Sequence, residues 1–346
     1  MMTPPSQHPW YQSPLTDESQ ILSSRIRLAR NISRYPFQQK LTPESAAAMV
    51  KEAKDSVTQA SAHNHFHQLS LQDLGETDHK VFLEKHIVSP EFLKGSLPKG
   101  LLISNDQNIS IMINEEDHIR IQSIKPGEDL TTAFFTANKI DDLMEETIAF
   151  AFHENYGYLT ACPTNVGTGL RASYMIHLPS LDKAGLIKNI LPGIVKFGIT
   201  LRGIYGEGTA PMGSIYQISN QTTLGKSEED IIECLQKVTK TVIEHEVTAR
   251  EKLISTKKDH LEDRIYRAYG TLAYSRKIST EEAMHQLSDI RLGYLTGILD
   301  KPKLPKQIYQ IMIEIQPGHL QRIAGHEMSD QERDTARANY LRSIFV

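Results

Sequence analysis

Three consecutive carboxylates at the end of an apolar run are the chemical feature that stands out in this chain. The β-branched stretch Ile111–Ile113 is followed closely by Glu115, Glu116 and Asp117, and Arg120 lies three residues further on. Carboxylates packed this closely repel one another, so the arrangement is favourable when a strongly basic group or a metal ion binds among them. The triplet predicts a site for such a guest. Taken alone, it would also suit a solvated acidic turn after a strand.

Arginines supply the opposite charge elsewhere in the chain. They occur in Ser- or Gly-rich stretches at Ser23–Arg27, Gly169–Ser173 and Arg202–Gly208, which we expect to form loops beside strands. A planar guanidinium binds phosphate oxygens bidentately and stays charged at any physiological pH. These stretches therefore predict a phosphate site. Arg30 and Arg34 lie outside the stretches and are expected at the surface.

The composition is that of a globular protein with room for one large or two ordinary domains. The chain has 346 residues, of which 39% are hydrophobic and 23% charged, and its formal net charge is −4. That charge gives no general case for nucleic-acid binding, since such domains are usually basic. The two cysteines, Cys162 and Cys234, lie in different contexts, so we expect no disulfide framework and a reducing compartment.

The N-terminal residues carry no pattern of a secretory signal. Met1–Trp10 lacks a basic segment followed by an apolar one, and we find no apolar run of about 18 residues. The chain is therefore expected to act in the cytoplasm and not at a membrane.

Hydrophobic periodicity in the first half predicts a mainly antiparallel sheet flanked by helices. A helix should begin at Thr42 and Pro43, which suit a cap and a first turn. Strands are expected at 101–104, 109–113 and 119–124, the first two joined by a hairpin loop. A long helix is expected over 129–155.

The second half of the chain predicts further strands and then helices only. Strands are expected at 171–178, 199–202 and 214–219, with a helix over 181–195, and capping signals start helices at Ser227 and Ser279. We therefore expect an α+β protein in three parts. These are a flexible arm over 1–20, a catalytic domain over 21–250 and a helical C-terminal domain over 251–346.

Four separated motifs make the chain resemble the phosphagen (guanidino) kinase family, which includes arginine and creatine kinases. They occur in the family's order and cover roughly residues 20 to 240. The motifs are Ser23–Arg27, Asn114–His118 with Arg120, Cys162–Ser173, and Arg202–Glu207. The sequence contains neither a Walker-type phosphate loop nor the His-Arg-Asp loop of protein kinases. The resemblance implies a phosphagen-kinase-like catalytic domain.

Within that family the chain looks most like the bacterial protein-arginine kinases. The small-molecule kinases begin with a helical domain of their own, whereas here the first arginine motif starts at Ser23. A helical segment instead follows the catalytic part. Its stretch Arg333–Ala338 resembles the phosphoarginine-binding motif of that group, which implies an allosteric site built from Arg333, Asp334 and Arg337.

The resemblance also implies roles for the acidic residues and for one cysteine. A guanidinium is a poor nucleophile because it is protonated and its lone pair is delocalised. Glu116 would orient it or take its proton, and Glu207 would be the second carboxylate that holds it. The family places Cys162 beside the guanidinium, where a thiolate would add negative charge. Glu115 and Asp117 would order the loop or act on magnesium through water.

The nucleotide site implied by the resemblance is built from arginines. The residues expected to contact ATP are Ser24, Arg25, Ile26, Arg27, His86, Arg120, Arg171, Ala172, Ser173, Arg202, Gly203 and Gly206. The arginines would neutralise the triphosphate and the charge on the transferred phosphoryl group. We expect no protein-built metal site, with Mg²⁺ held mainly by phosphate oxygens and water.

The leading interpretation is a kinase that uses ATP to phosphorylate arginine side chains in proteins. By resemblance it would act in the stress response, marking proteins for Clp-type degradation. Its partners would be protein substrates, a zinc-binding activator, a heat-shock repressor and a Clp-type unfoldase, and a homodimer is compatible with the helical C-terminal domain. The alternative is a kinase of free arginine or another small guanidino compound. A non-catalytic adaptor that binds arginine-phosphorylated proteins is the third hypothesis.

Overall fold

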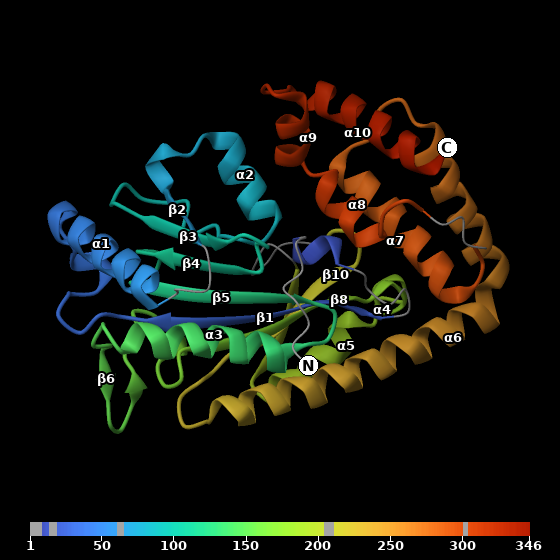
Figure 1. Ribbon diagram of the computed structural model, residues 1–346. Coiled ribbons are helices and arrows are strands. Elements are labelled where there is room, and N and C mark those ends of the chain that lie inside the picture. The colour runs from blue at the N-terminus through green and yellow to red at the C-terminus, as the bar shows by residue number, and fades with distance from the viewer. Residues whose placement is uncertain (1–8, 14–18, 61–65, 204–210, 300–303) are drawn as a thin grey trace, which may run out of the picture. The chain divides into compact units, whose positions relative to one another are not determined.

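The computed structural model describes residues 9–13, 19–60, 66–203, 211–299 and 304–346 (Figure 1). Its helices are α1 Pro43–Ala60, α2 Glu76–Glu84, α3 Leu130–Glu145, α4 Pro179–Lys183, α5 Ile187–Val195, α6 Glu228–Tyr274, α7 Thr280–Thr296, α8 Ile308–Glu314, α9 Pro317–Ala324 and α10 Asp330–Phe345. Its strands are β1 Ile21–Arg30, β2 Phe66–Ser70, β3 Gly100–Ser104, β4 Ile109–Ile113, β5 Ile119–Pro126, β6 Phe152–His153, β7 Gly157–Tyr158, β8 Leu170–His177, β9 Ile199–Gly203 and β10 Ile215–Asn220.

The strands and helices divide into two compact units. Eight strands hydrogen-bond in the order β2-β3-β4-β5-β1-β8-β10-β9, while β6 and β7 pair separately. Unit 1 comprises Met1–Ser13, Ser23–Tyr174 and Ser219–Leu235. Unit 2 comprises Pro14–Leu22, Met175–Ile218 and Gln236–Val346. The α+β class and the mainly antiparallel sheet predicted from the sequence are confirmed.

Antiparallel pairing in unit 1 determines which side chains share a face of the sheet. In the β1–β5 ladder Arg27 pairs with Gln122 and Ala29 with Arg120, and in the β4–β5 ladder Met112 pairs with Arg120. Side chains of directly paired residues point to the same face, and successive residues of a strand alternate between faces. Arg25, Arg27 and Arg120 therefore project from one face, which we call the arginine face.

The opposite face of unit 1 packs against α1 and α3 (Figure 1). Ile26 and Leu28 are almost fully buried there. Ser24 accepts a hydrogen bond from Asp129 N–H just before α3 and donates one to Gly127 O, each 2.7 Å long. These contacts attach the start of α3 to the centre of β1.

Arg30, at the end of β1, is also buried on this helix-covered face. Its guanidinium pairs with Asp141 of α3 at 2.6 Å, with side-chain exposures of 2% and 4%. It also donates to the carbonyls of Ala29 and Thr168 and stacks on the Tyr158 ring, 3.5 Å from the ring centroid. The expectation that Arg30 lies at the surface is wrong. Arg34 is exposed and pairs with Glu52.

A small hydrophobic cluster packs near the arginine face around the segment that follows α2. Its members come from this segment, from β3 and β4, and from the short turn of helix after β2. They are Leu71, Ile87, Val88, Phe92, Leu101, Ile103 and Met112. Residues 9–13, within the segment expected to be a flexible arm, also pack in unit 1. Trp10 is 1% exposed, and its indole N–H donates to Lys85 O at 3.3 Å.

Unit 2 is held together by buried polar contacts as well as by apolar packing. His177, at the end of β8, contacts Ser288 at 2.8 Å and Arg291 at 2.7 Å, and both partners lie on α7. Glu246 of α6 is 1% exposed and accepts the N–H groups of Ser180 and Leu181 at the start of α4. The long helix α6 is interrupted at Lys257, whose backbone angles are not helical.

Several local predictions differ from the structure in a way that physical chemistry explains. The helix expected over 129–155 ends at Glu145, where Glu145 and Glu146 place negative charge at the unfavourable end of the helix dipole. The helix expected over 181–195 is divided at Gly185, whose φ of 67° terminates α4. The described parts of the arginine stretches expected as loops lie largely within strands β1, β8 and β9, residues 204–208 being outside the described residues.

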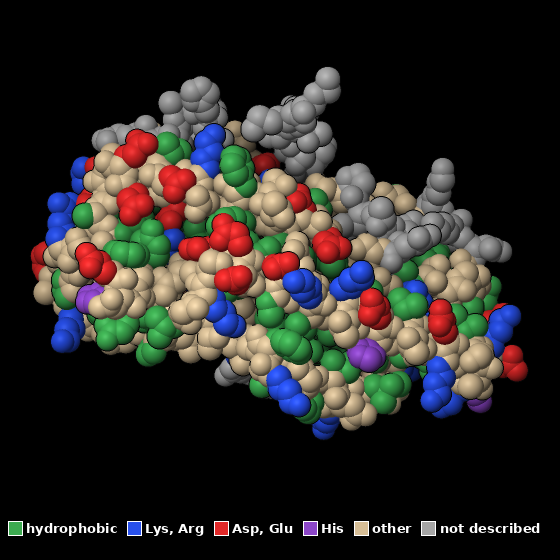
Figure 2. Space-filling model, turned by 90° about the horizontal axis from the view of Figure 1, so that it is seen from below, with side chains coloured by type: hydrophobic (Ala, Val, Ile, Leu, Met, Phe, Trp, Pro, Cys, Tyr) green, Lys and Arg blue, Asp and Glu red, His purple; other side chains and the backbone are tan. Residues whose placement is uncertain are grey.

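Charges of both signs are mixed on one face of the protein. Figure 2 shows acidic and basic side chains interspersed with apolar ones on the face that it presents. Over the described ranges, no helix has both the length and the apolar character needed to cross a lipid bilayer.

Replacing Asp141 by Ala should destabilise unit 1 strongly. The change leaves the buried Arg30 guanidinium without its counter-ion, and breaking such a pair costs about 3–5 kcal/mol. Chemical denaturation followed by circular dichroism would measure this loss. Asp55→Ala, which removes an exposed pair with Lys51, is the matched control and should leave the midpoint nearly unchanged. Equal effects of the two changes would contradict the assignment.

Candidate active site

The three carboxylates of the sequence lie in the hairpin loop between β4 and β5. Asn114 begins the loop with a φ of 65°, a left-handed conformation that Asn adopts more readily than most residues. Its N–H donates to His118 O at 2.8 Å, and its side-chain amide donates to Pro98 O at 2.7 Å. The tight loop makes the three acidic side chains point to different surroundings.

Glu115 is buried and paired. It is 4% exposed, its carboxylate accepts from Arg120 at 2.5 Å, and Ser89 donates a hydrogen bond to the same oxygen. Burial raises the pKa of Glu115, but the charge and hydrogen bonds of Arg120 and Ser89 outweigh it and lower the pKa to about 2. Glu115 is therefore ionised, and its charge is directed at Arg120.

Asp117 is also buried, and its carboxylate accepts one hydrogen bond from a side chain and one from a backbone N–H of another segment. Its Oδ1 accepts from Asn31 Nδ2 at 2.7 Å and from Ala161 N–H at 2.6 Å. Burial raises its pKa, although these two hydrogen bonds oppose the shift. Because Ala161 precedes Cys162, the Asp117 contact connects the acidic loop to the segment that carries the cysteine.

Asn31 was not singled out from the sequence, yet it holds the acidic loop in place. Its Oδ1 accepts from His118 N–H at 3.0 Å, and its Nδ2 donates to Asp117 and to Leu159 O. The His118 ring bonds Ile32 N–H through Nδ1 and Pro36 O through Nε2. A lone Asn after a strand carries no signal of this role, since its partners are distant in sequence.

Glu116 is the exposed member of the triplet. Partial burial and the neighbouring charges of Asp117 and Glu115 raise its pKa, while Arg120 and a hydrogen bond with Cys162 oppose the shift. Cys162 Sγ also lies 3.1 Å from Thr164 Oγ1. Glu116 and Cys162 are thus in contact, and the carboxylate can accept a further hydrogen bond from a cationic guest.

The arginine face concentrates positive charge beside these groups, and we include in it Arg171 of β8, the strand next to β1. Arg27 lies among Arg25, Arg120 and Arg171, and its pKa is lowered by burial and then by these three charges, with Glu115 opposing. Its Nε is buried and has no hydrogen-bond partner among the described residues. An unsatisfied donor among like charges is unfavourable unless an anion binds.

A glycine-rich turn completes the site. Gly169 has a φ of 65°, and a Cβ there would lie 2.6 Å from both Ala29 O and Arg30 Nη1. Only glycine fits this close approach to the end of β1. The contacts of Arg30 with Thr168 O and of Ala29 N–H with Gly169 O hold the turn against the strand.

These elements surround one pocket in unit 1, with about 440 Å³ of space that is partly open to solvent. Its wall combines the acidic loop, the arginine face and the cysteine segment. The lining residues are Arg27, Ala29, Glu115, Glu116, Asp117, Arg120, Cys162, Thr164, Asn165, Gly169 and Arg171. An acidic group that can receive a cation thus shares a pocket with a basic surface that can receive an anion.

Comparison with known proteins agrees with this chemistry. The profile of the ATP:guanido phosphotransferase C-terminal catalytic domain matches residues 48–249, and that of the protein-arginine kinase McsB C-terminal domain matches residues 258–346. The protein-arginine kinase of Halalkalibacterium halodurans is 46% identical over 97% of this chain and 94% of its own length. That of Caldanaerobacter subterraneus subsp. tengcongensis is 45% identical over 94% of this chain and 96% of its own.

This chain belongs to the protein-arginine kinase family of ATP:guanido phosphotransferases. The resemblance drawn from the four motifs is confirmed, and the kinase is an ATP-dependent phosphotransferase with a guanidino acceptor.

Solved structures share the fold of the kinase. The duplicated taurocyamine kinase from Schistosoma mansoni with bound transition state analog components has a TM-score of 0.61 and 25% identity, over 71% of this chain and 37% of that one. A lombricine kinase has a TM-score of 0.57 and 26% identity, over 69% and 68% of the two chains. The predicted phosphagen-kinase-like fold is therefore confirmed.

The residues of the arginine face fit a triphosphate. The unpartnered Nε of Arg27 and the mutual repulsion of the four guanidinium groups are both relieved by a polyanion. Among the described residues, no group of three or more His, Cys, Asp or Glu side chains is arranged to hold a metal ion.

The remaining predicted nucleotide contacts of unit 1 lie on both faces of the sheet. Ser173 is on the arginine face, 3.4 Å from Arg25 Nε. Ile26 and Ala172 are buried side chains, and Ser24 has its hydroxyl engaged at the start of α3. These three thus present no side-chain donor to the pocket.

His86 lies near Arg25 at the end of α2. It has a φ of 57°, and burial together with the charge of Arg25 lowers its pKa to about 3, so the ring is neutral. Its backbone O accepts from Gln122 Nε2 at 2.8 Å.

Of the predicted site residues that lie beyond the catalytic motifs of unit 1, the structure describes only some. Arg202 and Gly203 are in β9 of unit 2, where Arg202 Nε donates to Thr200 Oγ1 at 3.4 Å. Gly206 and Glu207 lie outside the described residues.

The predicted phosphoarginine residues lie on α10 in unequal surroundings. Arg337 is 1% exposed and donates to Ile315 O, Ile278 O and Asp334 at 2.7–2.9 Å. Arg333 is closer to solvent, with a side-chain exposure of 21%, and bonds Met328 O and Asp330. The two guanidinium groups therefore make separate sets of contacts.

Proposed function

We propose that this chain transfers the γ-phosphoryl group of ATP to guanidinium groups of arginine residues in proteins. One observation carries the proposal: an exposed carboxylate, Glu116, lines the same pocket as Arg27, whose buried Nε has no hydrogen-bond partner among the described residues. A protein acceptor is supported by the match of residues 258–346 to the protein-arginine kinase C-terminal domain and by the named relatives.

In this proposal Glu116 accepts a hydrogen bond from the acceptor guanidinium and takes its proton. Cys162 lies beside it and adds a polarisable group to the same wall. Glu207, outside the described residues, would hold the second edge of the guanidinium. Two contacts on a planar cation orient the attacking nitrogen, and orientation supplies much of the rate in phosphoryl transfer.

The arginine face would bind the triphosphate and stabilise the negative charge that develops on the transferred phosphoryl group. Arg25, Arg27, Arg120 and Arg171 are its members in unit 1. We assign Arg202 to the same task, with Ser24, Ile26, His86, Ala172, Ser173, Gly203 and Gly206 nearby along the motifs. Mg²⁺ would be held chiefly by phosphate oxygens and water, because it loses its water ligands reluctantly.

We also propose how the chain divides into domains. We place the catalytic domain at 21–250 and the helical C-terminal domain at 251–346, with residues 1–20 as an arm. The ranges matched by the two family profiles support the boundary. Arg333, Asp334 and Arg337 would bind phosphoarginine in the C-terminal domain, Arg333 being the member nearest to solvent.

The cellular role proposed here rests on family membership. The kinase would act in the cytoplasm during stress and mark proteins for Clp-type degradation. A zinc-binding activator, a heat-shock repressor and a Clp-type unfoldase would be its partners, and it would form a homodimer.

Incubation with labelled ATP tests the acceptor directly. We expect acid-labile phosphate on an arginine-rich protein and little on free arginine. Labelling of free arginine alone would favour the small-molecule alternative, and no labelling of either would favour the non-catalytic adaptor. Both of these results would overturn the proposal.

Glu116→Gln should lower kcat by at least about 100-fold while ATP affinity changes little. The change removes the proton acceptor but no group of the arginine face, and general-base catalysis contributes about 10²–10⁴-fold. Steady-state kinetics and calorimetric ATP titration measure the two quantities. Glu76→Gln, at an exposed carboxylate of α2 that does not line the pocket, is the control. Turnover within a few fold of the parent would refute the role.

The pH dependence of activity should reflect the titration of Glu116. Its pKa is raised, so it loses its charge at a higher pH than an ordinary glutamate as the pH falls, and activity is lost with it. Asp117→Asn removes one of the charges that raise this pKa, while the amide oxygen that it introduces can still accept from Asn31 and Ala161. The acidic limb of kcat/KM should move to lower pH. An unmoved limb would contradict this account.

Arg333→Ala should weaken the binding of free phosphoarginine by about tenfold, the loss of a charged hydrogen bond. Arg337 is unsuitable for this test because its burial would confound binding with folding. Arg276→Ala, an exposed arginine of the same unit, is the matched control. Calorimetry that finds equal affinities for both variants and the parent would remove Arg333 from the site.

A further inference from the structure

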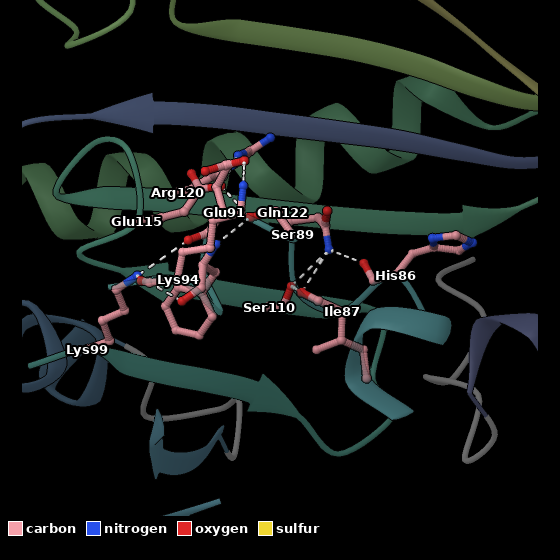
Figure 3. Close-up of polar contacts among 11 residues, drawn as sticks. His86, Ile87, Ser89, Glu91, Lys94, Lys99, Ser110, Glu115, Arg120 and Gln122 are labelled. Carbon is pink, nitrogen blue, oxygen red and sulfur yellow. Dashed lines mark hydrogen bonds and ion pairs between the residues drawn. The ribbon is translucent and has the colours of Figure 1, made fainter. Parts of the chain in front are cut away.

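The segment that follows α2 is fastened beside the arginine face by side chains of the sheet (Figure 3). At its start, Gln122 Nε2 donates to His86 O at 2.8 Å and Ile87 O at 3.2 Å, and Ser110 Oγ donates to Ile87 O at 2.7 Å. We call residues 86–94 the strap.

The far end of the strap is fastened by a buried lysine. Lys99 is 2% exposed, and its ammonium group donates to Phe92 O at 2.8 Å, to Glu91 O at 3.4 Å and to Lys94 O. Figure 3 shows Lys99 at one end of the strap and Gln122 at the other. The backbone between them is thus held at both ends.

Ser89 lies between these anchors and contacts Glu115. Phe92 N–H donates to Ser89 Oγ at 3.1 Å, so the hydroxyl oxygen is already engaged as an acceptor. The single Ser89 proton is then directed to Glu115 Oε1, the oxygen that also accepts from Arg120 Nη1. Hydrogen bonds therefore connect Phe92 to Ser89, Ser89 to Glu115, and Glu115 to Arg120.

We propose that Ser89 is a positioning residue for nucleotide binding, which acts through Glu115 to fix the guanidinium of Arg120. The inference rests on the proposed function, because it takes Arg120 to be a ligand of the triphosphate. Ser89 holds the shared oxygen in place, and Glu115 in turn holds Arg120 beside Arg27 against the repulsion between these two guanidinium groups.

The proposal makes the strap part of the nucleotide site without direct contact between Ser89 and ATP. Without the hydroxyl, Glu115 keeps its charge but loses one of the hydrogen bonds that orient it. Arg120 would then sample orientations that do not face the phosphates. The loss should appear in ATP affinity and hardly at all in the affinity for the guanidino acceptor.

Ser89→Ala and Ser110→Ala form a matched pair for the test. Both remove one hydroxyl that touches the strap, but the Ser110 hydroxyl bonds Ile87 and Gln122 rather than Glu115. We expect Ser89→Ala to raise the Kd for ATP about 3- to 10-fold, the usual effect of one hydrogen bond. Ser110→Ala should raise it less than about twofold, and the KM for the acceptor should be unchanged in both.

A double-mutant cycle with Glu115→Ala, which removes the oxygen that Ser89 bonds, separates positioning from mere loosening of the strap. If Ser89 acts through Glu115, adding Ser89→Ala to Glu115→Ala should cause little further loss of ATP affinity. Thermal unfolding of each variant checks that the protein remains folded. Equal effects of Ser89→Ala and Ser110→Ala, or full additivity in the cycle, would overturn the inference.

Assays of the parent protein distinguish a failure of this inference from a failure of the proposed function. A parent that neither binds ATP nor labels a guanidino acceptor would refute the function itself. A parent that does both, combined with an unaltered Kd in Ser89→Ala, would refute only the role of Ser89.

Discussion

Repulsion among four guanidinium groups on one face of a sheet is the constraint on which the rest of the site depends. Arg25, Arg27, Arg120 and Arg171 come from three strands, and the pKa of Arg27 is lowered by the burial and crowding that result. A cluster of this kind is tolerated when fixed negative charge lies beside it and when an anion can bind. The surrounding structure meets the first condition, and the pocket leaves space for the second.

The acidic loop meets the first condition with one residue and leaves another available. Glu115 is buried against Arg120, Asp117 is buried against Asn31 and Ala161, and Glu116 remains exposed beside Cys162. Three neighbouring residues of the same charge therefore have three different surroundings. Burial and hydrogen bonding, rather than residue type, separate them.

The different surroundings of the three carboxylates also show what could and could not be predicted from the sequence. Alternating apolar residues predicted the strands on either side of the acidic loop, and the motifs predicted that Glu116, Cys162 and Arg27 share a pocket. Sequence alone could not say which carboxylate of the triplet is exposed, because that depends on distant donors such as Asn31. Arg30 was misplaced for the same reason, since its partner Asp141 lies 111 positions away.

The same long-range contacts explain how β1 can serve packing and chemistry together. Arg25 and Arg27 project from the arginine face, while Ser24, Ile26 and Arg30 project toward the helices, so a shift of one residue would exchange the two sets. The bonds of Ser24 to the start of α3 and of Arg30 to Asp141 are available only in the observed register. Contacts on the helix-covered face therefore hold Arg25 and Arg27 together on the opposite face.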